Sequence, residues 1–333
     1  GPQSAGADPG PACYGSGGSE PTVTDANLLL GRLAADTTLA GGVALDREAA
    51  SRAVGALAHS LGLEELEAAE GIVRIANQEM GRALRVVTVE RGLDPRRFAL
   101  LPFGGAGPMH AAAIAAELGI ERLLCPRASG VLSALGLCAS EHRHDTARTV
   151  MLSGGELDAE RIAREVDALR AAIGEAPGAE PSVVYELRYR GQAFELPVPG
   201  GTRADPDDLV ERFERAHEER YGHRDPNGTV VLVHIRLAMV AAGPNPQPAA
   251  GEGDLHETTR PVRFDGEWLE ATVLRGEPAA GARAAGPVVF ELPETTLVLP
   301  PGWSAQVDEA GTIVAERENS GPRGTRPEGS DGA

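Results

Sequence analysis

Lysine is absent from this sequence, and each of its 31 basic residues is an arginine. A phosphate-binding loop of the G-x-x-x-x-G-K-[ST] type requires a lysine, so that loop is excluded. A biotin- or lipoate-carrying hairpin requires one too, and is excluded for the same reason. The arginine bias, together with the many alanine and glycine residues, indicates a GC-rich bacterial genome.

Cysteine is also scarce, since Cys13, Cys125 and Cys138 are odd in number and lie far apart. This pattern predicts neither a disulfide framework nor a zinc site, and it favours the cytoplasm as the compartment. No apolar run approaches the length of a membrane span, and no segment resembling a signal peptide begins the sequence. We therefore expect no membrane partner.

Positive charge is the minority, because 49 acidic residues give a formal net charge of −18 at pH 7. Such a charge argues against nucleic acid as a partner, since the phosphate backbone would be repelled overall. Hydrophobic residues make up 42% of the 333 positions. This is enough for two or three domains with real cores.

The stretch from Phe98 to His110 changes its period in the middle. Its first half, up to Phe103, is a short apolar run that predicts a buried strand, and its second half opens a small-residue helix predicted over residues 109–118. Between them lies a glycine-rich segment, residues 104–108, which we call the glycine turn. Its spacing does not match the dinucleotide fingerprint G-x-G-x-x-G. A nucleotide pocket and tight packing of strand against helix both remain open on this spacing.

The glycine turn is suited to close approach of a ligand. Gly104, Gly105 and Gly107 leave Ala106 as the only residue of the four that carries a Cβ atom. The N–H groups at the start of the following helix favour anions. Pro108 lies in the first helical turn, where a proline costs nothing.

Five segments, in chain order, resemble signatures of one family. They are SAGADPGPACYG (residues 4–15), PTVTDAN (21–27), VERG (89–92), the stretch containing the glycine turn (98–110) and YRGQ (189–192). In these segments the chain is similar to the hydantoinase A and 5-oxoprolinase family, ATP-dependent enzymes with an actin-like ATPase fold. The resemblance covers most of the chain.

The resemblance implies an α/β fold class: the second lobe of an actin-like (sugar kinase/actin) ATPase fold, followed by an α+β domain and a small β-rich C-terminal module. We expect the partial ATPase lobe over residues 1–150, the α+β domain over 151–258 and the β-rich module over 259–318. Residues 319–333 are low in apolar residues, which predicts a disordered tail. Because residue 1 is a glycine instead of a methionine and lies inside what resembles a family motif, we expect the C-terminal part, roughly half, of a longer protein.

As the resemblance implies, ATP phosphorylates the amide carbonyl oxygen of a hydantoin, 5-oxoproline or related lactam, and water then opens the activated ring. Mg²⁺ neutralises the transferring phosphoryl group. The glycine turn would hold the adenosine side of ATP, with His110 nearby. The implied partners are a small cyclic amide, a hydantoinase B-type subunit, and further copies in a homo- or hetero-oligomer. No residue is assigned as the catalytic base.

Two alternatives stay open. The chain also resembles the related acetone carboxylase subunit, which uses ATP to activate substrates for carboxylation. A non-catalytic nucleotide-binding or assembly module belongs to a different class. The two acidic-glycine loops that grip the γ-phosphate in actin-like ATPases are not found in these 333 residues. We therefore expect that this chain alone does not hydrolyse ATP.

A long amphipathic helix predicted over residues 63–91 supplies further candidates. Apolar residues recur there at three- and four-residue steps and predict its buried face: Ala68, Ile72, Ile75, Ala76, Met80, Ala83 and Val87. The polar residues Asn77, Gln78 and Arg82 fall off this stripe. In actin-like ATPases a helix of the second lobe contributes polar side chains to the adenosine, so the resemblance makes these three candidate ligands. A solvated helix face is the alternative.

Asp8 and Asp25 are candidates for a loop on the substrate side. Asp8 lies in a loop rich in glycine and proline, where capping of a turn is the alternative role. Either Asp25 or Thr24 precedes the apolar run 28–33 and predicts a helix cap, which is again the alternative to a ligand role.

His142 and His144 would share one face of a strand, as alternate strand residues do. A third ligand with plausible spacing is missing from the sequence, so we expect no metal site here.

The remaining sequence predicts regular elements. Helices are expected over residues 46–62, 158–173 and 205–221, with Asp46 starting the first. Strands are expected over residues 122–125, 183–189, 192–199 and 229–242, and a series of short strands follows from residue 261. Asp265-Gly266 is a strong hairpin signal within that series.

Overall fold

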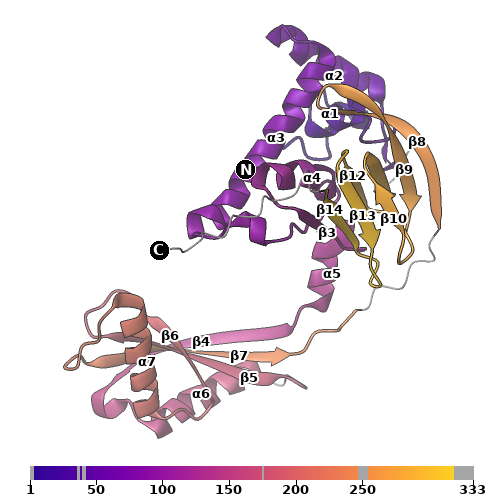
Figure 1. Ribbon diagram of the computed structural model, residues 1–333. Helices are drawn as coiled ribbons and strands as arrows, with labels where there is room; N and C mark the ends of the chain where they lie inside the picture. The colour runs from indigo at the N-terminus through magenta and orange to yellow at the C-terminus, as the bar shows by residue number, and fades with distance from the viewer. Residues whose placement is uncertain (1–3, 36–37, 40–42, 175, 247–253, 319–333) are drawn as a thin grey trace, which may run out of the picture. The chain divides into compact units, whose positions relative to one another are not determined.

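The computed structural model describes residues 4–35, 38–39, 43–174, 176–246 and 254–318. The chain is a mixed α/β protein with several sheets, and it divides into two compact units (Figure 1). The first unit combines residues 1–135 with 247–333, and the second comprises residues 136–246. Unit two is therefore an insertion in the sequence of unit one.

Helices form most of the first part of unit one. They are α1 (Val23–Leu29), α2 (Arg47–Leu61), α3 (Glu65–Val87) and α4 (Gly107–Leu118), with the 3₁₀ turns η1 (Ala12–Tyr14), η2 (Val89–Arg91), η3 (Pro95–Arg97) and η4 (Ser129–Val131). The helix α5 (Leu132–Ala139) crosses the boundary between the units. The first three helices share one apolar core with β8 and β9 of the sheet described next.

Three sheets complete unit one. The first contains β8 (Leu255–Phe264), β9 (Glu267–Gly276), β11 (Val288–Leu292) and β12 (Thr295–Leu299) in the order β12-β11-β9-β8. The second contains β3 (Arg122–Cys125), β10 (Arg283–Ala285), β13 (Trp303–Val307) and β14 (Ile313–Arg317) in the order β10-β13-β14-β3. A small third sheet pairs β1 (Thr38–Leu39) with β2 (Val43–Ala44).

The C-terminal strands belong to the same compact unit as the N-terminal helices. Strand β14 pairs antiparallel with β3, with Ile313 opposite Cys125. The N–H group of Arg263 donates to Leu30 O at 2.9 Å, which ties β8 to the chain after α1. The apolar faces of these strands pack in common cores with the helices of this unit. The domain boundaries at residues 150 and 258 stay predictions, and the predicted tail lies outside the described residues.

Unit two is a four-stranded antiparallel sheet with two helices packed against it. Its strands are β4 (His142–Ser153), β5 (Glu180–Tyr189), β6 (Leu196–Gly200) and β7 (Val230–Ala241), in the order β4-β7-β5-β6. Its helical segments are η5 (Gly154–Glu156), α6 (Ala159–Ile173) and α7 (Pro206–Tyr221). The strands and helices share one apolar core, which includes Tyr185 and Phe213.

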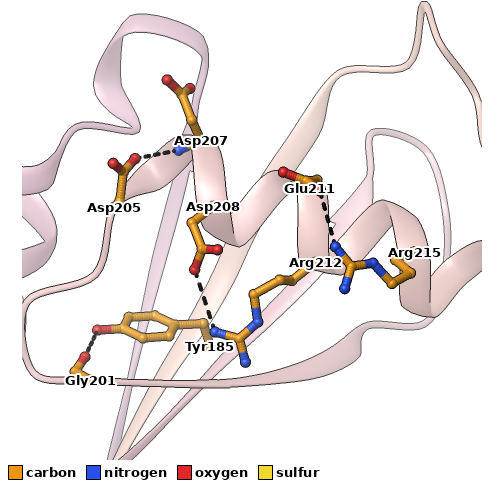
Figure 2. Close-up of polar contacts among 8 residues, drawn as sticks. All are labelled: Tyr185, Gly201, Asp205, Asp207, Asp208, Glu211, Arg212 and Arg215. Atoms are coloured by element: carbon orange, nitrogen blue, oxygen red, sulfur yellow. Dashed lines mark hydrogen bonds and ion pairs between the residues drawn. The ribbon is translucent and has the colours of Figure 1, made fainter.

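Figure 2 shows polar contacts along α7 and at Tyr185 of the sheet. Asp205 caps the helix by accepting a hydrogen bond from Asp207 N at 2.9 Å. Two ion pairs one turn apart lie along the helix: Arg215 Nη2 is 3.0 Å from Glu211 Oε1, and Arg212 Nη1 is 3.4 Å from Asp208 Oδ2. The Tyr185 hydroxyl donates to Gly201 O at 2.8 Å, so the largest buried side chain of the sheet also satisfies its polar atom.

The helix starts in unit one follow the predicted caps with one shift. Asp46 accepts from Glu48 N and Ala49 N, and α2 begins at Arg47 as predicted. Helix α1 begins earlier than predicted, because Thr22 is its N-cap and Asp25 closes a capping box from the third helical position. The capping role of Asp25 is confirmed, and a cap at Thr24 is wrong.

Asp25 does more than cap α1. Its carboxylate is fully buried and accepts hydrogen bonds from Thr22 N (2.9 Å), Thr22 Oγ1 (2.7 Å), Cys13 N (2.8 Å) and Ala12 N (3.3 Å). The same carboxylate therefore joins the N-terminal loop to the helix. Burial and the neighbouring Asp25 raise the pKa of the Cys13 thiol, so this cysteine stays protonated.

Two predictions about apolar patterns are wrong. The segment 98–103 is not a strand: it forms only an isolated parallel bridge between Leu100 and Leu123, and Phe98 and Phe103 are exposed. Leu100 makes two backbone hydrogen bonds to β3, one to Arg122 O and one from Leu124 N. The pairing does not continue, because Pro102 has no N–H group to donate.

The buried face of α3 also differs from the predicted stripe. Buried positions proceed by four-residue steps from Ala69 through Val73 to Gly81, with half-buried Asn77 between them. Ile75, Ala83 and Val87 lie to the side of this line and are exposed. The shift matters because it moves Asn77 onto the buried face.

The Asp25→Ala substitution should lower the free energy of unfolding by about 3 kcal/mol, because it leaves several buried N–H groups without an acceptor. As a matched control, Asp46→Ala removes an exposed helix cap and should cost about 1 kcal/mol. Chemical denaturation of both variants measures the difference. Equal losses would contradict the joining role of Asp25.

Candidate functional site

A cavity of about 580 Å³ in unit one brings together segments that are far apart in the sequence. Its walls come from the N-terminal loop and α1, from the glycine turn and α4, and from the sheet containing β9, β11 and β12. The lining residues are Tyr14, Val23, Thr24, Asn27, Leu33, Ala34, Gly105, Ala106, Met109, His110, Arg275, Gly276 and residues 291–296. The volume and the mixture of apolar walls with a few polar groups are typical of small-molecule sites.

The glycine turn forms one wall of this cavity and is held from two directions. Gly104, whose φ of +82° favours glycine, donates its N–H to Ser129 O at 2.8 Å. On the other side, the Thr295 hydroxyl lies 3.0 Å from Gly104 O and 3.1 Å from Gly105 O. The backbone of the turn is therefore fixed before any ligand arrives.

The hairpin tip between β11 and β12, residues 292–295, packs against this region. A Cβ atom on Gly130 would lie only 2.4 Å from Glu294 Cβ, so the tip requires a glycine there. A Cβ atom on Gly105 would meet nothing closer than Glu294 O at 3.7 Å, which is ordinary contact. Packing thus requires Gly130, whereas the space beside Gly105 belongs to the cavity.

His110 lies in the first turns of α4 and is 4% exposed. Its Nδ1 lies 2.7 Å from Asn77 Oδ1, which can only accept, so we assign the ring proton to Nδ1. Burial, and then the nearby charge of Arg32, lower the pKa of His110 to about 4. The imidazole is therefore neutral near pH 7.

Arg32 is the cation beside His110. Its guanidinium donates to Asn27 Oδ1 at 3.4 Å and lies 5.9 Å from the centre of the Phe264 ring. Burial lowers its pKa, and its Nε atom has no hydrogen-bond partner among the described residues. It remains charged because an arginine pKa starts far above neutrality.

The predicted site residues divide into three groups: those at the cavity, those that support its wall, and those away from it. Gly105, Ala106 and His110 line the cavity, and Asn77 reaches it through its hydrogen bond to His110. The other members of the glycine turn, Gly104, Gly107 and Pro108, support this wall without lining it.

Four further candidates lie away from the cavity. Gln78 and Arg82 are exposed on α3, where Arg82 pairs with Glu79 at 3.3 Å. Asp8 is exposed in the N-terminal loop, and the carboxylate of Asp25 is occupied by N–H and hydroxyl donors of the chain.

Several lining residues were not identified from the sequence. Tyr14 and Asn27 lie inside two of the family motifs, so those motifs could have indicated them. Glu291, which accepts from Arg260 Nη1 at 2.8 Å and Arg275 Nε at 2.7 Å, had no local signal. Its place in the wall depends on long-range strand pairing.

Within the described ranges, no group of three or more His, Cys, Asp or Glu side chains is arranged to hold a metal ion. His142 and His144 are both exposed on β4. No helix in the part of the chain that the structure describes is both long and apolar enough to span a lipid bilayer.

Two family models match most of the chain. Residues 1–146 match the hydantoinase/oxoprolinase family, and residues 175–316 match the hydantoinase/oxoprolinase C-terminal domain. The caprolactamase subunit alpha of Pseudomonas jessenii is 35% identical over 337 residues, which cover 94% of this chain and 48% of that protein.

Two solved structures are also similar. The ATP-dependent caprolactamase of Pseudomonas jessenii has 34% identity and a TM-score of 0.67, covering 96% of this chain and 50% of that one. A nucleotide-free acetone carboxylase has 27% identity and a TM-score of 0.76, covering 95% and 49%. The chain spans about half the length of these relatives. The matches to both parts of the chain show that it belongs to the hydantoinase/oxoprolinase family.

Proposed function

We propose that this chain supplies the adenosine-binding part of an ATP-dependent hydrolase that opens cyclic amides such as hydantoins, 5-oxoproline or lactams. The observation that carries the proposal is the convergence of three family motifs on one cavity. Tyr14, Asn27 and the glycine turn belong to separate motifs and line the same walls. The name of the similar ATP-dependent caprolactamase supports both the nucleotide and the lactam class.

The cavity fits the uncharged end of ATP. Gly105 and Ala106 leave room for close approach, while His110 offers a neutral polar group between apolar walls. ATP, when bound, supplies the phosphoryl group that activates the amide carbonyl oxygen. The role of this chain is to bind and orient the nucleotide so that this group is correctly placed. In this proposal, residues 1–150 are the second lobe of an actin-like ATPase, and Mg²⁺ accompanies the phosphates.

A carboxylase is the second candidate, favoured by the TM-score of 0.76 to acetone carboxylase. The two reactions differ in their co-substrate, because carboxylation consumes bicarbonate and hydrolysis consumes water. We also propose that the chain works in a multi-subunit assembly, with a B-type subunit as the partner. The name of its relative as a subunit alpha supports this. The cytoplasm is the proposed compartment, supported by three free cysteines.

Replacing Gly105 by valine should weaken ATP binding at least tenfold, about 1.4 kcal/mol, because the branched side chain would enter the cavity. The fold should persist, since the nearest atom to a Cβ there is 3.7 Å away. Gly71→Val on α3 is a matched control, because a Cβ at Gly71 meets nothing within 4 Å and this residue does not line the cavity. Calorimetric titration with an ATP analogue measures both. Unchanged affinity in a folded Gly105→Val variant would remove the glycine turn from the nucleotide site.

The low pKa of His110 predicts a pH-dependent stability. The unfolded state binds a proton near pH 6.5 and the folded state only near pH 4, so acid favours unfolding between these values. From pH 7 to pH 4, the wild-type protein should lose about 3 kcal/mol more than His110→Gln. Urea unfolding at a series of pH values measures the loss. The exposed-residue control His256→Gln should follow the wild type, and an identical slope for His110→Gln would contradict the assignment.

The proposed reaction is tested by phosphate release with Mg-ATP and a panel of hydantoins and lactams. The complete protein with its partner subunit should release phosphate and the ring-opened product in equal amounts, an amino acid from a lactam and an N-carbamoyl amino acid from a hydantoin. The isolated chain should show no turnover, because adenosine contacts alone do not stabilise charge at the reacting phosphoryl group. Turnover that requires bicarbonate would favour the carboxylase, and turnover by the isolated chain would overturn the assigned role.

A further inference from the structure

Nε2 of His110 is the polar atom that this ring offers to the cavity. The other ring nitrogen, Nδ1, is occupied by Asn77 Oδ1 at 2.7 Å. Nε2 makes no hydrogen bond to any residue in the described ranges, and the ring lines the cavity. A ligand that fills the cavity therefore meets this nitrogen.

The bond to Asn77 determines what Nε2 can do. With the proton on Nδ1, the neutral ring presents a lone pair at Nε2 and can only accept a hydrogen bond there. Burial, and then the positive charge of Arg32, oppose protonation of the ring. Nε2 is therefore unsuited to a phosphate or carbonyl oxygen, which would also need a donor, and is suited to an N–H or O–H group.

The surroundings of His110 fit a flat base. Met109, Leu33, Ala34 and the ring of Tyr14 line the same cavity, and the glycine turn permits close approach. A purine would bury its apolar faces against these groups and leave the polar groups of one edge available for hydrogen bonds. Adenine carries an amine donor at position 6, whereas guanine and hypoxanthine carry an acceptor oxygen there.

We propose that His110 selects adenine over 6-oxopurines by accepting a hydrogen bond from the exocyclic amine, and that Asn77 positions it by fixing the ring proton on Nδ1. The inference rests on the proposed binding of ATP in this cavity. It assigns His110 to base selection and Asn77 to control of the tautomer. Replacing the amine by an oxygen would bring two acceptors together, which a buried site tolerates poorly.

The test is calorimetric binding of ATP and ITP to the complete protein at pH 8, where the imidazole is neutral. ITP differs from ATP only in carrying oxygen in place of the amine and a proton on N1. Wild type should prefer ATP by at least about tenfold. His110→Phe keeps the ring volume but removes the acceptor, so the preference should fall to within about threefold. Should His110→Phe fail to fold, His110→Ala carries the same comparison.

Asn77 variants separate control of the tautomer from structural support. Asn77→Ala leaves the ring proton free to move to Nε2, so the preference should fall as in His110→Phe. Asn77→Asp still accepts from Nδ1 and should keep the preference above tenfold. A purely structural role would give both Asn77 variants the same preference, and thermal unfolding shows whether each is folded.

The outcomes distinguish this inference from the function on which it rests. Binding of ATP with no preference over ITP, or a preference that His110→Phe leaves unchanged, overturns base selection and leaves the nucleotide site standing. A loss on 2′-deoxy-ATP that disappears in His110→Phe would make the ribose hydroxyl the donor and likewise overturn it. Failure of wild type to bind either nucleotide overturns the proposed function as well.

Discussion

The hydrogen bonds from the Thr295 hydroxyl to Gly104 O and Gly105 O are the contacts on which the cavity depends. They join residues 191 and 190 positions apart and hold the hairpin tip on the glycine turn. The tip can approach only because residue 130 is a glycine. Pairing of β14 with β3 brings the C-terminal strands to this part of the unit. The wall of the site is thus a product of the tertiary fold.

Short-range signals in the sequence predicted much of the secondary structure. Asp46 marked the start of α2, and Asp265-Gly266 marked the hairpin between β8 and β9. In both cases the decisive interaction lies within a few residues. The wrong predictions concern structure that depends on contacts with residues distant in the sequence. Whether residues 98–103 form a strand depends on a partner, and β3 offers only Leu123 as a bridge.

The same limit applies to the site: residues in contiguous motifs could be predicted, and residues brought in by the tertiary fold could not. The glycine turn and His110 could be identified because their motif is contiguous, and Gly105, Ala106 and His110 line the cavity. Asn77 and Gln78 are adjacent and equally polar, yet only Asn77 faces His110, because the buried face of α3 is set by its packing. The hairpin residues from Glu291 to Thr296 could not be found at all. No sequence pattern near them predicts their contact with the glycine turn, which lies about 190 positions earlier.

The charges around His110 show how a chain of net charge −18 can form a site for a ligand with an anionic end. Arg32 is half-buried, and burial of the imidazole together with the Arg32 charge disfavours the protonated form of His110, so this residue adds no second positive charge. Glu291 is nearly buried, and its negative charge is compensated by Arg260 and Arg275. The part of the cavity around His110 therefore offers a neutral acceptor instead of an ion. In the proposed function, such a site would bind the uncharged end of a nucleotide through shape and hydrogen bonding, and other groups would stabilise the phosphates.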